Sequence, residues 1–455
     1  KALPGVYDFA TMTTMNTTEK LRKHALSIPE ILLPNSTIDL AKWAVIACDQ
    51  YTQDRDYWKN AEKLANGAPS TLSLIFPEVY LEDSGRTERI QDIHRAMHEY
   101  LDPAGANVFA TPLHGCIYLE RTTAYGRVRK GLVTAIDLEA YDWKPDTTAM
   151  IRATEATIVD RIPPRMEIRR GAPLELPHIM LLVNDPDKTL VERSGTRVRN
   201  NKPCYDTRLE PEAGHITGWA VSSEEDLASL ADAVESIGKA NTCPDGSCFL
   251  FAVGDGNHSL ATAKAVWEEY REANGLTGEA AERHPARYAL IEIVNIHDDG
   301  LTFEPIHRVL FGADPEELAG FVKDKLGGTL SVAADESELE QQVASRTTTC
   351  FGFVSPGAKT ILESPDPALA VSRLQPVLDE FVAAHAGVTM DYIHGTDEVF
   401  RLGKKDGAVA ILLPPVEKNS FFSTIAATGP LPRKSFSMGE ASEKRYYLEC
   451  RKLFS

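Results

Sequence analysis

The sequence has fewer basic than acidic residues, and this lack of positive charge argues against some classes of binding partner. Its 455 residues include 66 acidic and 48 basic ones, which gives a formal net charge of −18. Non-specific nucleic-acid binding relies on a basic surface that displaces counterions from phosphates, so we expect no nucleic-acid partner. An anionic small molecule can still bind where basic side chains gather locally.

Long apolar runs and paired cysteines are also missing. No window approaches the roughly 18 continuous apolar residues of a membrane-spanning helix, and no secretory signal pattern stands at the start. The seven cysteines are an odd number without the spacing of a disulfide scaffold. Cys243 and Cys248 could pair or share a metal, but reduced thiols explain the pattern better. We therefore expect a cytoplasmic protein without a membrane partner.

Several catalytic motifs are absent as well. The chain has no Gly-Lys-Ser/Thr ending of a Walker A loop, no HExxH zinc motif and no Gly-x-Ser-x-Gly elbow. His94 and His98 lie four residues apart, as on one side of a helix. Without a further ligand motif, they are predicted to belong to a partly buried helix face rather than to a zinc site.

The chain does contain an alternation of helical and strand-like segments. Helical periodicity covers residues 17–28, 53–66, 86–101, 223–240, 259–272, 315–326, 336–346 and 368–386. Apolar strand-like runs between them predict an α/β (α+β) protein with mixed sheets flanked by helices.

The chain is longer than a protein built around a single hydrophobic core usually is, so we expect more than one domain. An N-terminal extension is expected over residues 1–29 and a main α/β domain over 30–310. A C-terminal α/β part is expected over 311–455, and its basic tail can return to the site of the main domain.

The stretch CFLFAVGDGNHSLATAKAVWEEY, residues 248–270, carries the clearest chemistry. An apolar run meets a glycine turn and a helical segment follows at once. Glycine allows close approach to the main chain, and the first amides of a helix carry partial positive charge, so this arrangement forms a cradle for an anion. The candidate binding residues of the turn are Gly254, Gly256, Asn257 and Ser259, beside the candidate catalytic residues Asp255 and His258.

Two side chains of this turn have chemical roles in the hypothesis. His258 can donate to a phosphate, and Asp255 can hold Mg²⁺ or accept a proton from a hydroxyl. The alternative is a tight β–α turn in which both side chains only cap the helix. The local pattern leaves these two interpretations open.

The segment MIRATEATIVDRIPPRMEIRR, residues 150–170, gathers arginines in an otherwise acidic chain. Arg152, Arg161 and Arg165 are candidate ligands for phosphate or carboxylate, because a guanidinium fork matches both. If residues 150–160 are helical, Glu155 lies near Arg152 and can accept a proton or bind metal. The alternative is a solvated face with local ion pairs.

Two further basic groups are candidates for the same site. FEPIHR contains His307 and Arg308 at the end of a strand-like run, and LPRKSFSMGEASEKR contains Arg433 and Lys434 near the C-terminus. Both groups can supply positive charge to a phosphate. The alternatives are a structural His-Arg pair and a basic tail that pairs with the acidic body.

Taken together, these segments resemble the bacterial and archaeal family called domain of unknown function 1015. The motifs that carry the resemblance are GLVTAIDLEAYD, IRATEATIVDR, VGDGNHSLATAKAVWE, FEPIHR and LPRKSFSMGEA. Most relatives have Asp-Gly-His-His-Arg at the glycine turn. Asp255, Gly256 and His258 match that pattern, whereas Asn257 and Ser259 depart from it, and a nearby arginine is expected to replace the missing one.

The glycine turn is also similar to the nucleotide-binding turn of the ParB/sulfiredoxin-like fold, whose members include ParB nucleotide switches, sulfiredoxin and the free serine kinases. The resemblance implies a nucleotide-binding core with phosphates over residues 254–260, and phosphoryl transfer with ATP or ADP and Mg²⁺. The leading hypothesis is a nucleotide-dependent kinase of a small polar metabolite, such as a hydroxy amino acid. A nucleotide- or phosphate-binding regulatory module and a phosphohydrolase are the alternatives, and the oligomeric state stays open.

Overall fold

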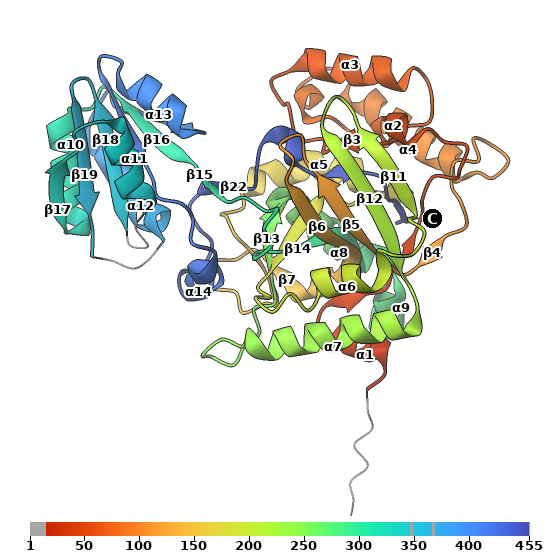
Figure 1. Ribbon diagram of the computed structural model, residues 1–455. Coiled ribbons are helices and arrows are strands. Elements are labelled where there is room, and N and C mark those ends of the chain that lie inside the picture. The colour runs from red at the N-terminus through yellow and green to blue at the C-terminus, as the bar shows by residue number, and fades with distance from the viewer. Residues whose placement is uncertain (1–14, 346–348, 366–368, 455) are drawn as a thin grey trace, which may run out of the picture.

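The computed structural model describes residues 15–345, 349–365 and 369–454. Figure 1 shows a larger and a smaller body, each with helices packed against a sheet. The sheet of the larger body has ten strands and that of the smaller body has six. The predicted α/β (α+β) class with mixed sheets flanked by helices is confirmed. Residues 1–14 of the expected extension, and residues 346 and 368 at the ends of two expected helices, lie outside the described residues.

The ten-stranded sheet is mixed and has the order β11-β12-β5-β6-β14-β10-β13-β8-β7, with β1 also paired to β6. Its two central strands are buried along their whole length, and β10 accordingly has an entirely apolar sequence. The strands are β1 (Leu26–Ser27), β5 (Cys116–Thr122), β6 (Val128–Asp137), β7 (Tyr141–Asp142), β8 (Ile151–Ala153), β10 (Ile179–Val183), β11 (Tyr205–Leu209), β12 (Gly214–Val221), β13 (Phe251–Asp255) and β14 (Tyr288–Asn295).

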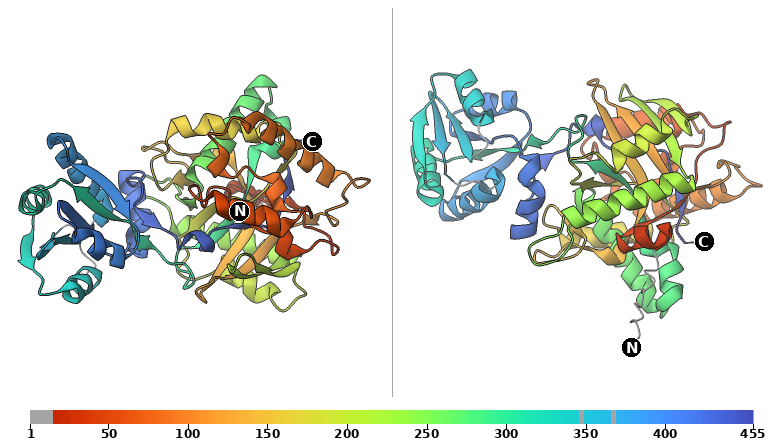
Figure 2. Two further views of the ribbon diagram at one scale, coloured as in Figure 1. Left: turned by 90° about the horizontal axis from the view of Figure 1, so that it is seen from above. Right: turned by 60° about the horizontal axis from the view of Figure 1, so that its bottom comes forward.

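Three hydrophobic clusters cover the two faces of this sheet, and the smallest joins Met180 and Leu182 of β10 to the C-terminal segment around Phe421. Side chains of a strand alternate between faces, so Tyr118 of β5 joins one cluster and its neighbours Ile117 and Leu119 join another. In Figure 2 the long helix α7 lies along one face of the larger body. The helices of this body are α1 (Thr17–Lys23), α2 (Leu40–Trp43), α3 (Arg55–Ala65), α4 (Arg86–Leu101), α5 (Ile162–Arg169), α6 (Val191–Val198), α7 (Glu224–Ala240), α8 (Asn257–Ala273) and α9 (Gly278–Arg283).

Helix α7 illustrates how the local sequence sets an element. Ser223 caps it by accepting from the amide of Asp226, and three acidic residues occupy its first turn. Leu230, Val234 and Ile237 recur at helical spacing and are buried against the sheet. The short 3₁₀ helices of the chain are η1 (Thr71–Leu74), η2 (Glu78–Tyr80), η3 (Leu138–Ala140), η4 (Val159–Arg161), η5 (Pro285–Arg287) and η6 (Ala441–Glu443).

The smaller body contains an antiparallel sheet of order β17-β19-β18-β21-β16-β20. Its strands are β16 (His307–Phe311), β17 (Thr329–Val332), β18 (Cys350–Ser355), β19 (Ala358–Glu363), β20 (Thr389–Ile393) and β21 (Ala408–Leu412). Its helices are α10 (Pro315–Leu326), α11 (Glu336–Ala344), α12 (Ala370–Ala384) and α13 (Thr396–Gly403).

After β21 the chain returns to the larger body through α14 (Lys418–Thr428), and its last strands pair with strands far away in the sequence. We propose on this topology that the second domain covers 307–412 and that the tail belongs to the first. The two-stranded pairs are β2 (Glu30–Ile31) with β4 (Leu113–His114), β3 (Val45–Ile46) with β23 (Tyr446–Tyr447), β9 (Leu174–Glu175) with β24 (Arg451–Lys452), and β15 (Glu304–Pro305) with β22 (Phe436–Ser437).

One local feature differs from the sequence-based expectations, and a second adds detail to them. Residues 151–153 form strand β8 rather than the start of a helix, because they pair in parallel with β13 inside the sheet. Residues 17–27, within the expected N-terminal extension, form α1 and β1, and β1 pairs with β6. The buried side chain of Leu21 anchors this segment in the core.

Candidate functional site

The glycine turn joins the end of β13 to the start of α8. Gly256 precedes the helix with a φ of +84°, in the left-handed region that favours glycine. A Cβ there would also lie 3.2 Å from the Cα of Ile179. Among the described residues, no side chain caps this helix N-terminus. The first amides of α8 therefore face outward as hydrogen-bond donors, as the anion-cradle hypothesis requires.

Gly254 has a different reason to be glycine. A Cβ at this position would lie 2.9 Å from the Cγ of Leu182 and 2.9 Å from the Sδ of Met438. The main chain of β13 is thus approached by the protein's own tail rather than by a ligand. Gly254 still contributes to the cavity wall described next.

A cavity of about 680 Å³ opens in front of the helix start. Its wall comes from the glycine turn, the segment around α5, the C-terminal tail and strand β20 of the smaller body. It brings together the predicted residues Glu155, Arg161, Arg165, Gly254, Asp255, Gly256, Asn257, His258, Ser259, Arg433 and Lys434.

Asp255 presents a carboxylate at the edge of this cavity. Its Oδ1 accepts from the amide of Gly256 at 3.0 Å, and its Oδ2 lies 3.6 Å from the Nζ of Lys444. About a quarter of its side chain is exposed, at 26%. Asp255 is therefore accessible to a cation or to a hydroxyl group, with an ammonium already beside it.

Glu155 is the second carboxyl group of the cavity wall. Its Oε1 accepts from the amide of Ser435 at 3.2 Å, so it also holds the tail in place. Burial raises the pKa of this carboxyl. A raised pKa makes this carboxyl a stronger proton acceptor than an ordinary carboxylate.

His258 lies in the first turn of α8 and faces the arginines. The amide of Ile158 donates to its Nε2 at 3.2 Å, which leaves the Nδ1–H as the donor of the neutral ring. Burial and the charges of Arg165, Arg161 and Arg433 lower the pKa of His258 to about 4. The ring is thus a neutral hydrogen-bond donor at pH 7, beside a cluster of positive charge.

This lowered pKa makes the stability depend on pH. The folded pKa of about 4 lies below the ordinary 6.5, so the unfolded chain binds the proton more readily between these values. The stabilisation is fully present above pH 6.5 and is lost as pH falls through 4. We expect it to amount to about 1–2 kcal/mol after solvent screening of a half-buried group.

Denaturant unfolding of the natural protein and His258→Gln at pH 4.5 and 7.5 measures this contribution. The natural protein should gain more stability on going to the higher pH than the variant does. An identical gain in both proteins would contradict the assignment.

Asn257 and Ser259, which differ from the family's usual sequence at the glycine turn, make different kinds of contact. Asn257 links α8 to the end of β8, because its Oδ1 accepts from the amide of Thr154 at 3.3 Å and its Nδ2 donates to the Thr154 hydroxyl at 3.4 Å. Ser259 lines the cavity and also a neighbouring apolar one. Asn257 is therefore occupied with holding the turn, and Ser259 is a small side chain where the related pattern carries arginine.

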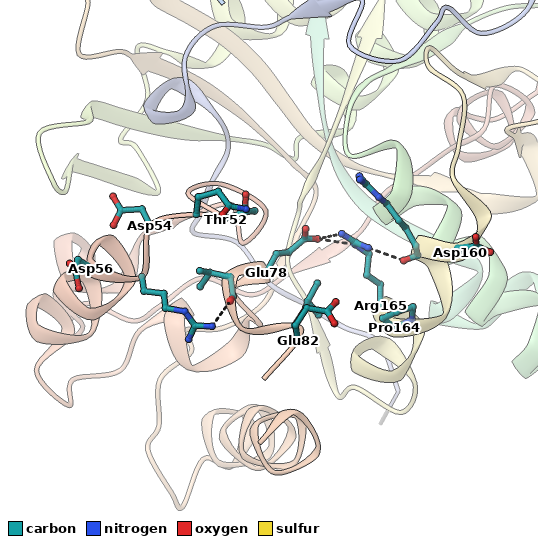
Figure 3. Close-up of a pocket in the computed structure, with 13 residues that line it drawn as sticks. Thr52, Asp54, Asp56, Glu78, Glu82, Asp160, Pro164 and Arg165 are labelled. Carbon is teal, nitrogen blue, oxygen red and sulfur yellow. Dashed lines mark hydrogen bonds and ion pairs between the residues drawn. The ribbon is translucent and has the colours of Figure 1, made fainter. Parts of the chain in front are cut away.

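The neighbouring arginines supply the positive charge. Arg165 of α5 donates its Nε to Glu78 at 2.8 Å and its Nη1 to the carbonyl of Arg161 at 2.8 Å. Figure 3 shows these contacts in an adjoining cavity of about 860 Å³, to which both arginines also contribute. Lys434 lies over the ring of Tyr392, 4.9 Å from its centroid. The cations of the site thus come from η4, from α5 and from the tail.

Three predicted residues are not brought to the cavity. The side chain of Arg152 donates to the carbonyl of Ala149 and to the hydroxyl of Ser247 at 3.0 Å, away from the turn. His307 accepts from the amide of Leu413 at 3.1 Å, and burial lowers its pKa to about 4. These two residues hold local structure rather than a wall of the cavity.

Arg308 is also buried outside the cavity wall. Its Nε donates to Gln375 at 2.7 Å, and its guanidinium lies 4.6 Å from the centroid of the Tyr392 ring. Because Tyr392 does line the cavity, Arg308 supports that wall from behind.

Several residues of the wall were not anticipated from the sequence. Asp49 lies in a loop after β3, and its carboxylate is 3.4 Å from Nε2 of His178. Burial opposes ionisation of Asp49, but the charges of His178 and Lys444 lower its pKa below the usual range. The Nδ1 of His178 hydrogen-bonds the Tyr447 hydroxyl at 2.5 Å. No local motif marks Asp49, because only the pairing of β3 with β23 brings it here.

The described residues include no ready-made cage for a metal ion. Within the described ranges, no group of three or more His, Cys, Asp or Glu side chains is arranged to hold a metal ion. Mg²⁺ in phosphate sites often uses only one or two carboxylates plus phosphate oxygens, and the accessible Asp255 fits that donor set.

Cys243 and Cys248 are free thiols. The Nε2 of His94 contacts the carbonyl of Ile168 at 2.9 Å, as a partly buried helix residue would.

Comparisons with known proteins identify the family of this chain. A family model described as "Protein of unknown function (DUF1015)" matches residues 32–381. The chain belongs to the DUF1015 family. The match spans the glycine turn, the arginine segment and most of the smaller body, which confirms the resemblance seen in the sequence. A search of the curated proteins finds no match.

Solved structures similar to this DUF1015 protein include a free serine kinase mutant in complex with ADP, at 10% identity and a TM-score of 0.36, covering 69% of this chain and 90% of that one. The same kind of kinase mutant in complex with AMP gives 11% identity, a TM-score of 0.37 and the same coverage. A conserved hypothetical protein from Pyrococcus furiosus gives 10% identity, a TM-score of 0.34 and coverage of 68% and 90%. Among the described residues, no helix has the length and apolar character needed to cross a membrane.

Proposed function

We propose that this DUF1015 protein is a nucleotide-dependent kinase that transfers a phosphoryl group to the hydroxyl of a small polar metabolite. The observation that carries the proposal is the uncapped N-terminus of α8, which opens onto a cavity of about 680 Å³ lined by cations and carboxylates. Phosphoryl transfer needs positioning and charge neutralisation more than covalent chemistry. This cavity offers both.

The residues divide into two groups by their chemistry. The amides of α8 and the Nδ1–H of His258 donate to a phosphate, while Arg161, Arg165 and Arg433 neutralise its charge. Asp255 can hold Mg²⁺, which when bound would neutralise charge on the nucleotide phosphates.

The reaction also needs a proton acceptor. The acceptor hydroxyl forms a bond to the γ-phosphorus, the bond from that phosphorus to the bridging oxygen breaks, and ADP leaves. Asp255 is the base for the hydroxyl proton in this proposal, because its carboxylate is accessible from the cavity. Glu155 is the rival base, since its raised pKa and its place in the wall also suit proton transfer.

A second candidate function is a regulatory module that binds nucleotide or phosphate without chemistry. It is favoured by Lys444, whose ammonium lies 3.6 Å from Asp255 and competes with a metal ion. Asn257, which is occupied by contacts with Thr154, favours it as well.

Incubation of the full chain with ATP, Mg²⁺ and a panel of hydroxyl compounds tests the proposal. A kinase yields ADP and a phosphorylated acceptor in equal amounts. A phosphohydrolase instead yields inorganic phosphate without an acceptor. Tight nucleotide binding in calorimetry with no turnover would support the regulatory module, and a protein that binds neither nucleotide nor phosphate would exclude all three functions.

A further inference from the structure

A second cavity of about 160 Å³ adjoins the first, and most of its wall is apolar. It shares Glu78, Arg165 and Ser259 with the polar cavity, so the two spaces meet at these three residues. The apolar part of the wall includes Leu74, Ile75, Phe76, Met97, Ile168 and Leu176.

Most polar side chains of this wall already have partners. Glu175 is ion-paired with two arginines. His178 contacts Asp49 and Tyr447. The hydroxyl of Thr262 donates to the backbone carbonyl one turn earlier at 2.7 Å. A ring rich in nitrogen and oxygen would bury polar atoms against groups that are already engaged, which is costly. A hydrocarbon group has no hydrogen bonds to water to give up, so its burial in this cavity is favourable.

Ser259 stands at the junction of the two cavities. It belongs to the first turn of α8, beside the amides that face the polar cavity. The related sequence pattern has arginine at this position, whose long side chain would occupy the junction. The other two residues of the junction, Glu78 and Arg165, are ion-paired with each other, and serine fills less of the junction than arginine would.

We infer that the acceptor is a small metabolite with a polar end and an apolar end: its hydroxyl lies in the polar cavity, and a short alkyl or phenyl arm lies in the apolar one. This inference rests on the proposed function and names its substrate class. The product is then a phosphate monoester whose phosphate lies against the amides of α8. Such esters are direct probes of both cavities.

Calorimetry of the full chain with inorganic phosphate and with methyl, n-butyl and phenyl phosphate tests the inference. Butyl and phenyl phosphate should bind about tenfold or more tightly than methyl phosphate, because each buried methylene adds to the affinity. Ala172→Leu narrows the apolar cavity only. It should remove this gain and leave the affinity for methyl phosphate unchanged.

Two further variants control for folding and for the location of the arm. Ala240→Leu, at an exposed position of α7, should keep the full gain. Met97→Ala enlarges the apolar cavity and should shift the preference toward a longer n-hexyl ester.

The outcomes separate the inference from the proposed function. Equal affinities for methyl and phenyl phosphate would overturn the inference and leave the phosphate site intact. A gain that persists unchanged in Ala172→Leu would also overturn it, since the arm would then lie elsewhere. If neither inorganic phosphate nor any ester binds, the anion cradle itself is wrong, and both the proposed function and the inference fall.

Discussion

Replacement of Arg445 by methionine is expected to destabilise the protein by about 3–5 kcal/mol. The Arg445 side chain is 1% exposed and lies between the carboxylates of Glu292 and Glu449, both fully buried. Its Nη1 donates to Glu292 at 2.8 Å, and its Nη2 is paired with Glu449. Methionine fills part of the space but leaves two buried carboxylates with less compensation, and that uncompensated charge is the source of the loss.

Chemical denaturation of the natural protein and Arg445→Met measures this effect. Lys452→Met is the control, because Lys452 lies in the same tail but is exposed, and substitutions at such positions usually change stability by less than about 0.5 kcal/mol. A loss below about 1 kcal/mol in Arg445→Met would show that the buried pairs contribute little.

The same network explains how the tail reaches the site. Arg129 donates to the carbonyl of Glu443 at 2.7 Å and also lies 3.4 Å from Glu292. Residues 443–445 are thereby fixed to the large sheet by buried ion pairs. Lys444, between two of these anchors, is held beside Asp255. Loss of the network therefore affects the cavity as well as the stability.

The glycine turn could be predicted because its chemistry is local. A left-handed glycine, the end of an apolar strand and the start of an amphipathic helix all lie within a few residues, and the structure has them in this arrangement. Arg161 and Arg165 could be proposed for a similar reason, since the residues around Pro163 and Pro164 place both beside α8. The local sequence is therefore enough to predict the part of the site that lies closest to the turn.

The rest of the site depends on long-range pairing that no local pattern shows. Asp49 reaches the cavity only because β3 pairs with β23, whose residues lie 400 or more positions later in the chain. Tyr392 comes from the edge strand of the smaller body. Arg152 looked equivalent to Arg161 in the sequence, but it lies on strand β8 and its side chain contacts the loop around Ser247. Whether Arg152 lies in a strand or in a helix decides the direction of its side chain. The hydrophobic periodicity of this segment does not distinguish the two.

Asp255→Asn is expected to lower kcat for phosphoryl transfer by about 10²–10⁴-fold, the usual contribution of a general base. The amide keeps the size of the side chain and can still accept from the amide of Gly256. It cannot take the hydroxyl proton and is a poor ligand for Mg²⁺. A loss of kcat with an unchanged KM for the nucleotide indicates the base role, whereas a raised KM indicates that Asp255 holds the metal.

Steady-state kinetics with the acceptor found in the panel gives both parameters. Asp160→Asn makes the same charge change at an exposed position of the adjoining cavity and should keep kcat within about twofold. Glu155→Gln is the decisive comparison, since Glu155 is the rival base. If Asp255→Asn retains full activity while Glu155→Gln loses it, Glu155 takes the proton, and the role of Asp255 is reduced to shaping the turn and pairing with Lys444.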